Sequence, residues 1–132
     1  MIVVDTSAVI AVLWEEVGSA RYLDAINAAD AVVVGAPNAL EVYMVATGRY
    51  GVPAGEKALV SLQALDIRIA AFTPTLVGLA GQAFERFGKG RNKAGLNYGD
   101  CMSYALAKSL DAPLLYKGND FALTDLRSAV IA

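Results

Sequence analysis

Histidine is absent from this chain of 132 residues, and Cys101 is its one cysteine. Without an imidazole and with a single thiol, the chain cannot assemble a Cys/His zinc site or a Cys–His catalytic pair. The glycine signatures of nucleotide phosphate binding, GxGxxG and GxxxxGK(S/T), are also missing. Any hydrolytic site in this protein must therefore use oxygen ligands, and Cys101 is interpreted as a small core residue.

Long hydrophobic runs are missing as well. Charged residues interrupt the opening segment at Asp5, Glu15, Glu16 and Arg21, so no stretch there approaches the ~20 apolar residues of a membrane-spanning helix. The same segment lacks the basic n-region and the cleavage site of a signal peptide. We therefore expect a cytoplasmic protein that does not bind membranes.

The length of the chain suits one compact domain, and we expect residues 1–132 to form a single domain. Hydrophobic residues make up 56% of the chain and the mean hydropathy is +0.46, which is high for so small a protein. This apolar excess predicts that a partner covers part of the surface. The first two helices are candidates for the groove that receives it, although the same side chains would serve as core: Val12, Leu13, Trp14, Tyr22 and Leu23.

Basic residues are concentrated in one short segment. The net charge of −2 argues against a protein that coats nucleic acid with its whole surface. The segment RFGKGRNK nevertheless carries Arg86, Lys89, Arg91 and Lys93 without an acid, and its glycines indicate a loop. These four side chains are either contacts for nucleic-acid phosphates, since the loop precedes Asp100, or part of a solvated connector.

Apolar runs alternate with helical patterns along the chain. We predict strands over residues 2–5, 31–35, 67–72 and 112–116. Helices are predicted over about 6–16, 18–30, 37 to a stop near 48–51, 52–66, 74–88 and 98–110, and residues 121–132 are expected to be irregular. This alternation is typical of an α/β fold with a mostly parallel sheet.

Four acidic residues stand at strand ends or helix starts of this pattern. Asp5 ends the first strand, Glu41 follows PNAL, Asp100 opens DCMSYALAKSL and Asp120 follows PLLYKGN. Parallel sheets bind ligands at the carboxyl ends of their strands, so we expect the four carboxylates to converge in one cleft. Mg²⁺ and Mn²⁺ prefer carboxylate ligands, and phosphodiester hydrolysis is the natural chemistry of such a cluster.

Each of these acids also has a structural explanation. Glu41 and Asp100 stand three residues after Asn38 and Asn97, which is the spacing of a capping box, and Asp5 suits a helix N-cap. Asp120 suits a turn. The remaining acids, Glu16 and Asp125 among them, fall at helix faces or ends where solvation is expected, and Glu16 is expected at the far end of the first helix, away from the cleft.

Four segments resemble the PIN-domain toxins of the VapC type. They are the opening IVVDTSAVIAVLWEE, the internal LEV at 40–42, GKGRNKAGLNYGDCMSYALAK at 88–108 and PLLYKGNDFALTDL at 113–126. The resemblance covers nearly the whole chain in order. It implies a PIN-like three-layer fold, with a central sheet of four to five strands flanked by helices, and a magnesium-dependent endoribonuclease that is the toxin half of a toxin–antitoxin pair.

The resemblance also implies site residues and partners. The family's acidic, metal-binding site falls on Asp5, Glu41, Asp100 and Asp120, with Mg²⁺ as the ion and Mn²⁺ as a substitute. The hydroxyl of Thr6 or Ser7 would position a water or the substrate. Asn119 stands where many relatives have a further Asp, and we assign it no metal. The partners implied are an RNA substrate, a second copy of the chain in a homodimer, and an antitoxin whose tail lies over the active site.

Three alternatives to a toxin remain open. An aspartyl-phosphate phosphotransferase also begins with a strand that ends in Asp, but its pattern usually has a second Asp two residues later, where this chain has Ser7. A housekeeping PIN nuclease would share the acidic site without the toxicity. A catalytically inert binding module would have the cleft but bind no metal.

Overall fold

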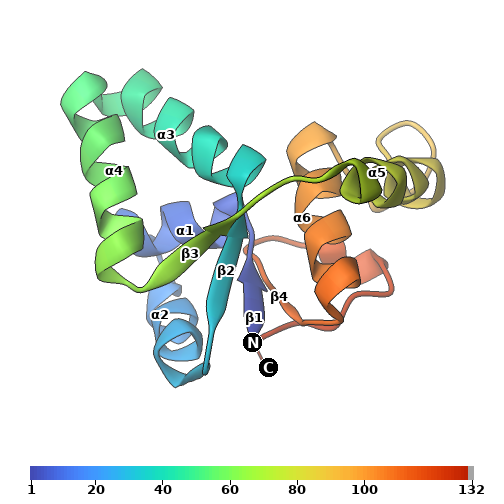
Figure 1. The fold of residues 1–132 in the computed structure, drawn as a ribbon, viewed down its shortest axis with the longest axis horizontal. Helices are drawn as coiled ribbons and strands as arrows, with labels where there is room; N and C mark the ends of the chain where they lie inside the picture. Colours follow the sequence, from blue (N-terminus) through green and yellow to red (C-terminus); the bar gives the residue numbers. More distant parts are fainter. Residues whose placement is uncertain (131–132) are drawn as a thin grey trace.

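A parallel sheet forms the centre of the computed structural model, which describes residues 1–130. Within these residues four strands pair in the order β3-β2-β1-β4, all parallel (Figure 1). The strands are β1 (Ile2–Val4), β2 (Val32–Gly35), β3 (Ile67–Ala70) and β4 (Leu114–Leu115). The predicted α/β fold with a mostly parallel sheet of four to five strands is confirmed.

Helices cover both faces of the sheet, which gives three layers (Figure 1). One face is covered by α1 (Thr6–Leu13), α2 (Ser19–Ala28), α3 (Ala36–Tyr50) and α4 (Val52–Ala64). The other face is covered by α5 (Pro74–Phe87) and α6 (Tyr98–Leu110), and the short 3-10 helix η1 (Phe121–Leu123) follows β4. None of the helices in residues 1–130 combines the length and the apolar character needed to cross a bilayer.

Successive side chains of each strand point to opposite faces of the sheet, and this divides the hydrophobic core into two halves. Val4 and Val34 point to the α1–α4 face, while their neighbours Val3 and Val33 point to the α5–α6 face. Because successive side chains of a strand face opposite ways, a strand covered on both sides must be apolar throughout. This is why β1 and β2 are continuous runs of buried residues.

All four strands are shorter than predicted, β1 and β2 by one residue each and β3 and β4 by more, and helix α1 ends earlier than expected. The predicted strand over 67–72 ends at Ala70, because its partner β2 ends opposite, at Gly35. The predicted strand over 112–116 keeps two residues, since Pro113 has no N–H to donate and the backbone N–H of Lys117 turns to a side chain instead. The first helix ends at Leu13 rather than near residue 16.

The other predicted helices lie within a few residues of their expected bounds. Helix α6 spans the predicted residues 98–110, and α5 begins with the predicted first-turn proline at Pro74. In the C-terminal segment, η1 and an isolated bridge between Leu114 and Ser128 interrupt the expected irregular chain. Residues 131 and 132 of that segment lie outside the described residues.

Candidate active site

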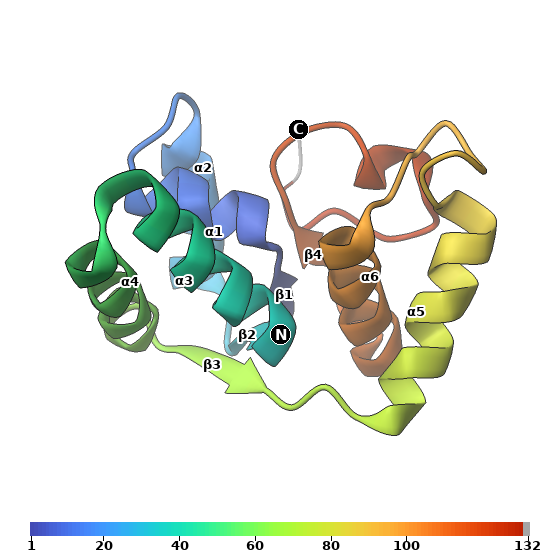
Figure 2. The same cartoon turned by 90° about the horizontal axis from the view of Figure 1, so that it is seen from above.

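An open cleft of about 320 Å³ lies at the carboxyl ends of the strands. Helices α1 and α3, the start of α6 and the segment after β4 contribute its walls, and Figure 2 shows α3 and α6 on opposite sides of β1. Three of the four predicted acids line it directly, and the full lining is Asp5, Thr6, Ser7, Ile10, Glu16, Glu41, Val45, Arg49, Asn97, Asp100 and Lys117. The predicted convergence is therefore observed for Asp5, Glu41 and Asp100.

Asp5 is buried at the junction of β1 and α1, with 3% of its surface exposed. Its Oδ2 accepts hydrogen bonds from the backbone N–H of Ser7 at 3.0 Å and from the Ser7 hydroxyl at 2.6 Å, so Asp5 is the N-cap of α1. Its Oδ1 accepts a hydrogen bond from the Ser103 hydroxyl at 2.6 Å. Asp5 therefore caps α1 and also lines the cleft, and hydrogen bonds to both of its carboxylate oxygens fix its orientation.

Glu41 lies in the second turn of α3 and takes no part in a capping box. The N-cap of this helix is Gly35, so the box suggested by the spacing of Asn38 and Glu41 does not form. The Glu41 carboxylate packs against Gly99 instead. A β-carbon at Gly99 would lie 2.8 Å from Glu41 Oε2 and 2.9 Å from Oε1, so the glycine leaves the space that this carboxylate occupies.

Asp100 forms the capping box that its spacing from Asn97 predicted. Asn97 Oδ1 accepts a hydrogen bond from the Asp100 N–H at 2.9 Å, and Asp100 Oδ2 accepts one from the Asn97 N–H at 3.0 Å. Burial nevertheless raises the pKa of Asp100 to about 6, against the opposing hydrogen bond from Asn97, and the charges of Asp5, Asp120 and Glu41 raise it further. The cap therefore holds a carboxylate in the field of three other acids.

Asp120 stands apart from the other three acids. It is exposed, it precedes η1, and its side chain makes no capping hydrogen bond there. It does not line the cleft directly, although its charge acts on Asp100. Its neighbour Asn119 is also exposed, and its backbone carbonyl accepts a hydrogen bond from the N–H of Ala122.

The hydroxyls of Thr6 and Ser7 are engaged in hydrogen bonds within the protein. The Ser7 hydroxyl bonds Asp5 and also accepts the Lys117 N–H at 3.0 Å, while the Thr6 hydroxyl donates to the Asn38 carbonyl at 3.3 Å. These contacts orient the Asp5 carboxylate and the start of α3. Their predicted role in positioning a water or a substrate stays a prediction.

Asn38 and Ser103 contribute to the site, although neither residue was predicted from the sequence as part of it. Asn38 is 1% exposed, and its Nδ2 donates to Thr6 Oγ1 at 3.3 Å and to the Gly99 carbonyl at 3.1 Å. It therefore joins the starts of α1, α3 and α6, which carry the three acids. Ser103 was detectable as a lone hydroxyl three residues after Asp100, inside an otherwise apolar helix face.

Glu16 lines the cleft, contrary to the prediction that it lies at the far end of the first helix. The chain reverses after α1 because Glu15 adopts the left-handed conformation, with φ of 48°, and the N–H of Glu16 bonds back to the Ala11 carbonyl at 2.9 Å. This turn brings Glu16 Oε1 to 2.8 Å from Lys117 Nζ. Lys117 and Arg49 add two positive charges to the lining of the cleft.

None of the four basic residues predicted to bind RNA lines the acidic cleft. Arg86 lies 3.6 Å from Asp125 and over the ring of Phe87, and Arg91 donates to the Glu85 carbonyl at 3.3 Å. Asp125 is thus paired rather than simply solvated. Lys89 and Lys93 are exposed in a loop that runs beside η1, where Arg91 and Lys93 line a second hollow with Leu123.

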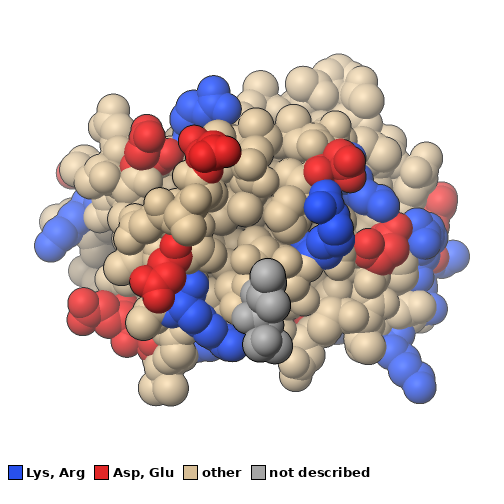
Figure 3. Space-filling view, turned by 90° about the horizontal axis from the view of Figure 1, so that it is seen from below, with Lys and Arg blue, Asp and Glu red and all other residues tan. Residues whose placement is uncertain are grey.

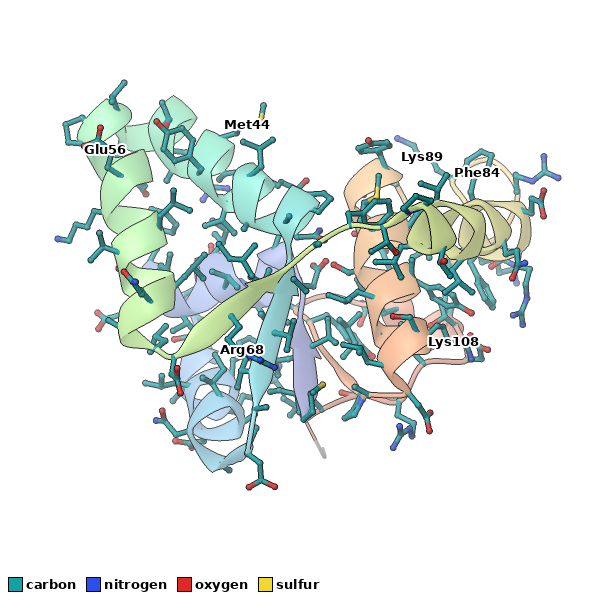
Figure 4. All side chains as sticks on the ribbon, in the orientation of Figure 1. Met44, Glu56, Arg68, Phe84, Lys89 and Lys108 are labelled. Atoms are coloured by element: carbon teal, nitrogen blue, oxygen red, sulfur yellow. The ribbon has the colours of Figure 1, made fainter. Side chains whose placement is uncertain are left out.

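Acidic and basic side chains are interspersed on the face of the molecule seen in Figure 3, with no extended area of one sign. Figure 4 places Lys89 near the α5–α6 pair, at the edge that also carries Phe84. The proposed contact of Arg86, Lys89, Arg91 and Lys93 with nucleic acid stays a prediction. The net charge of −2 gives no general attraction for a polyanion, so any such contact must be local.

The acidic lining fits a divalent cation in donor type and in charge. Asp5, Glu41 and Asp100 offer oxygen ligands, with the exposed Asp120 outside the lining, and a cation would offset the burial and the neighbouring acidic charges that raise the pKa of Asp100. As placed in residues 1–130, no three Asp, Glu, Cys or His side chains converge closely enough to hold an ion. Oxygens of two of these acids, Asp5 and Asp100, accept hydrogen bonds from Ser7, Ser103 and Asn97.

Two apolar surfaces are present, and the first adjoins the cleft through Glu41 and Val45. Between α3 and α6 a hollow of about 490 Å³ includes Leu40, Met44 and Tyr98, which are 57%, 62% and 79% exposed. Leu13 and Trp14 line a smaller groove with Tyr50 and residues of α4, and α2 contributes nothing to it; that this groove receives a partner stays a prediction. Tyr22, predicted for the same groove, is 3% exposed and belongs to the core instead.

Residues 2–126 match the family model described as the PIN domain. The chain is 42% identical over 125 residues to ribonuclease VapC of Mycolicibacterium smegmatis, covering 94% of this chain and 96% of that protein. It is 37% identical over 129 residues to ribonuclease VapC30 of Mycobacterium tuberculosis, covering 98% of each. Matches of this extent establish the family of the chain.

Solved structures share the fold at low sequence identity. The crystal structure of Mycobacterium tuberculosis VapC20, described as a sarcin–ricin loop cleaving toxin, matches with a TM-score of 0.80 at 16% identity, covering 99% of this chain and 100% of that one. A toxin–antitoxin complex from Klebsiella pneumoniae matches with a TM-score of 0.72 at 15% identity, covering 100% and 97%. The three-layer arrangement is thus the one these proteins have.

Proposed function

The chain belongs to the PIN-domain family, as a relative of the VapC ribonucleases, and we propose that it is a ribonuclease toxin that hydrolyses RNA phosphodiester bonds with the help of a divalent cation. The observation that carries the proposal is the acidic cleft. Asp5, Glu41 and Asp100 line it from three different helix starts or turns, and Asp120 adds its charge. Carboxylates gathered in this way suit Mg²⁺, with Mn²⁺ as a substitute.

Asp5 and Asp100 are the proposed direct ligands, and Glu41 and Asp120 would complete the shell through waters or a second ion. When bound, the cation supplies a Lewis acid that lowers the pKa of water and offsets charge on a phosphate oxygen. Ser7 and Ser103 hold the Asp5 carboxylate in place from both of its oxygens. Asn38 fixes the spacing of the helix starts from which the acids project.

Proton transfer must proceed without histidine. Burial raises the pKa of Asp100 to about 6 in the metal-free cleft, and a bound cation would favour its ionised form. Its Oδ2 keeps the hydrogen bond to the Asn97 N–H. We therefore infer that Asp100 orders the start of α6 and binds the cation as a carboxylate, and that a water or another carboxylate takes the proton.

An antitoxin and a second copy of the chain are the proposed partners. The apolar surfaces support this, because Leu40, Met44 and Tyr98 are large, exposed and adjacent to Glu41. A basic side chain of an antitoxin tail would pair with the acids of the cleft and take the place of the metal. The groove beside Leu13 and Trp14 is the proposed seat for apolar residues of that tail.

The direct test is cleavage of single-stranded RNA by the purified chain with Mg²⁺, with Mn²⁺ and with a chelator. We expect cleavage with either ion and none with the chelator. Expression of the chain alone should arrest growth of a host cell, and co-expression of its antitoxin should relieve the arrest. Metal-dependent cleavage by a chain that is harmless to the cell would contradict the toxin function and favour a housekeeping nuclease.

A further inference from the structure

Two residues that line the acidic cleft, Lys117 and Glu16, form an ion pair. Lys117 Nζ lies 2.8 Å from Glu16 Oε1, and the two side chains are 41% and 30% exposed. The backbone N–H of Lys117 donates to Ser7 Oγ at 3.0 Å, and this hydroxyl donates to Asp5 Oδ2 at 2.6 Å. One hydroxyl therefore separates the backbone of Lys117 from the most deeply buried acid of the site.

The charges around the cleft create a problem for an anionic substrate. Four carboxylates line it, those of Asp5, Glu16, Glu41 and Asp100, against the two cations Lys117 and Arg49 among the described residues. A phosphodiester that enters this cleft meets a net negative field, which a bound divalent ion offsets at its own position only. The phosphates on either side of the reacting one need cationic side chains of the protein.

Three other cations of the chain form ion pairs away from the cleft. Lys108 and Arg86 pair with Asp125, and Arg127 pairs with Asp111. Lys117 differs because its partner, Glu16, is itself part of the cleft lining. An exposed pair of this kind contributes little to stability, so a phosphate can replace the carboxylate at low cost.

We propose that Lys117 is a phosphate-binding residue for the RNA strand and that Glu16 holds its ammonium group at the cleft until the strand arrives. The inference rests on the proposed ribonuclease function. On binding, the ammonium group exchanges the Glu16 carboxylate for a phosphate oxygen, and Glu16 returns to solvent. The hydrogen bond from the Lys117 backbone to Ser7 keeps the lysine next to Asp5 throughout.

The alternative is that the pair is only a clamp between the turn after α1 and the segment after β4. The two cases differ in the effect of Glu16. If the pair is a clamp, Lys117→Met and Glu16→Gln break the same contact and change RNA binding in the same direction. If Glu16 restrains a phosphate contact, Lys117→Met weakens binding and Glu16→Gln strengthens it.

The experiment measures binding of a fluorescently labelled, short single-stranded RNA across a series of salt concentrations. All variants carry Asp100→Asn and the buffer contains a chelator, so no cleavage interferes. We expect Lys117→Met to weaken binding about tenfold and to reduce the slope of log affinity against log salt by about 0.7, the loss of one phosphate contact. Glu16→Gln should tighten binding about two- to fivefold.

Two control variants accompany this series. Lys57→Met removes the same charge from α4, outside the cleft, and should leave the affinity within error of the parent. Lys117→Arg keeps the charge and should bind as the parent does, which also guards against a folding defect in Lys117→Met. Equal effects of Lys57→Met and Lys117→Met, or weaker binding in Glu16→Gln, would overturn the proposal.

Cleavage assays with the native Asp100 test the proposed ribonuclease function separately from the phosphate contact of Lys117. If the native chain cleaves RNA with Mg²⁺ but Glu16→Gln binds more weakly, the phosphate contact fails and the ribonuclease stands. If the native chain cleaves no RNA with either ion, the proposed function fails, and the binding series still decides whether Lys117 contacts phosphate.

Discussion

The carboxylates at the two ends of α6 have pKa values that are shifted in opposite directions. At its start, Asp100 lies among other acids and its pKa is raised to about 6 by burial and by their charges. Towards its end, Lys108 lies 2.8 Å from Asp125, which also accepts a 2.6 Å hydrogen bond from the Tyr104 hydroxyl. Burial opposes ionisation of Asp125 too, but the hydrogen bonds from Lys108 and Tyr104 outweigh it and lower its pKa. Figure 4 labels Lys108 at this second end.

The difference distinguishes the proposed functional cluster from a structural one. A fold that only needs stability pairs each acid with a cation or a donor, as at Asp125. The acids around Asp100 have hydroxyl and backbone donors. Among residues 1–130, the one ion pair in their cleft involves Glu16 rather than any of the four predicted site acids. Such uncompensated charge costs stability and is retained where a cation or a substrate will compensate it.

Substitution of the uncompensated acid should have the largest effect. We expect Asp100→Asn to lower RNA cleavage on the order of 100-fold or more, because losing even an indirect partner of a metal typically costs about 10–100-fold. The free energy of unfolding of the metal-free protein should hold or rise, since one of the repelling charges is gone. Cleavage rates and urea unfolding of the same preparation test both. Equal cleavage, or a loss of about 1 kcal/mol of stability, would reduce Asp100 to a capping residue.

The opposite pKa shifts of Asp100 and Asp125 should also appear in the pH dependence of the stability of the metal-free protein. Between about pH 4 and about pH 6 the folded chain holds a proton on Asp100 that the unfolded chain releases, so stability of the metal-free protein should fall as the pH rises. We expect a fall of no more than about 2 kcal/mol, since the group is partly exposed to solvent. Urea unfolding in a chelator measures it.

The same titration of Asp100→Asn is the control, and its curve should lack this fall. Asp125 should behave in the opposite sense, because its lowered pKa stabilises the folded chain above the ordinary carboxyl pKa and that stability is lost as the pH falls below about 4. A native curve that rises between about pH 4 and about pH 6 would contradict the repulsion assigned to Asp100.

Removing the compensated acid should affect stability alone. Asp125→Asn weakens the contacts with Lys108 and Tyr104, and we expect a loss of about 1–2 kcal/mol, because hydrogen bonds to a charged group are strong but this one is partly exposed. The cleavage rate at a temperature where the variant is folded should equal that of the native chain. A drop in cleavage rate similar to that of Asp100→Asn would contradict the assignment of a purely structural role to Asp125.

The smallest effect is expected at the glycine that makes room for Glu41. In Gly99→Ala the new methyl group would displace the Glu41 carboxylate, since a β-carbon added at this position lies 2.8 Å from Oε2. Because the end of a glutamate is flexible, stability should hardly change, while cleavage should fall about fivefold as the carboxylate is misplaced. Gly78→Ala is the matched control, as a β-carbon there meets nothing within 4 Å. Unchanged cleavage in Gly99→Ala would remove Glu41 from the site.

Local rules made part of this protein predictable. The start of α6 follows from the spacing of Asn97 and Asp100, and its predicted span of residues 98–110 is the observed one. The apolar runs at β1 and β2 predicted buried parallel strands because both of their faces are covered. Convergence of Asp5, Glu41 and Asp100 followed from the rule that parallel strands present their carboxyl ends at one edge.

Contacts between distant segments were decided by the tertiary structure alone. The hydrogen bond of Ser103 to Asp5 joins residues 98 positions apart, and the bond of Asn38 to the Gly99 carbonyl joins residues 61 apart. The position of Glu16 in the cleft depends on the left-handed backbone conformation of Glu15 and on the position of Lys117 after β4. Hydrophobic periodicity and capping residues record which face of an element is buried and where it starts, whereas the distance across the sheet between two polar side chains is set by packing of the whole core.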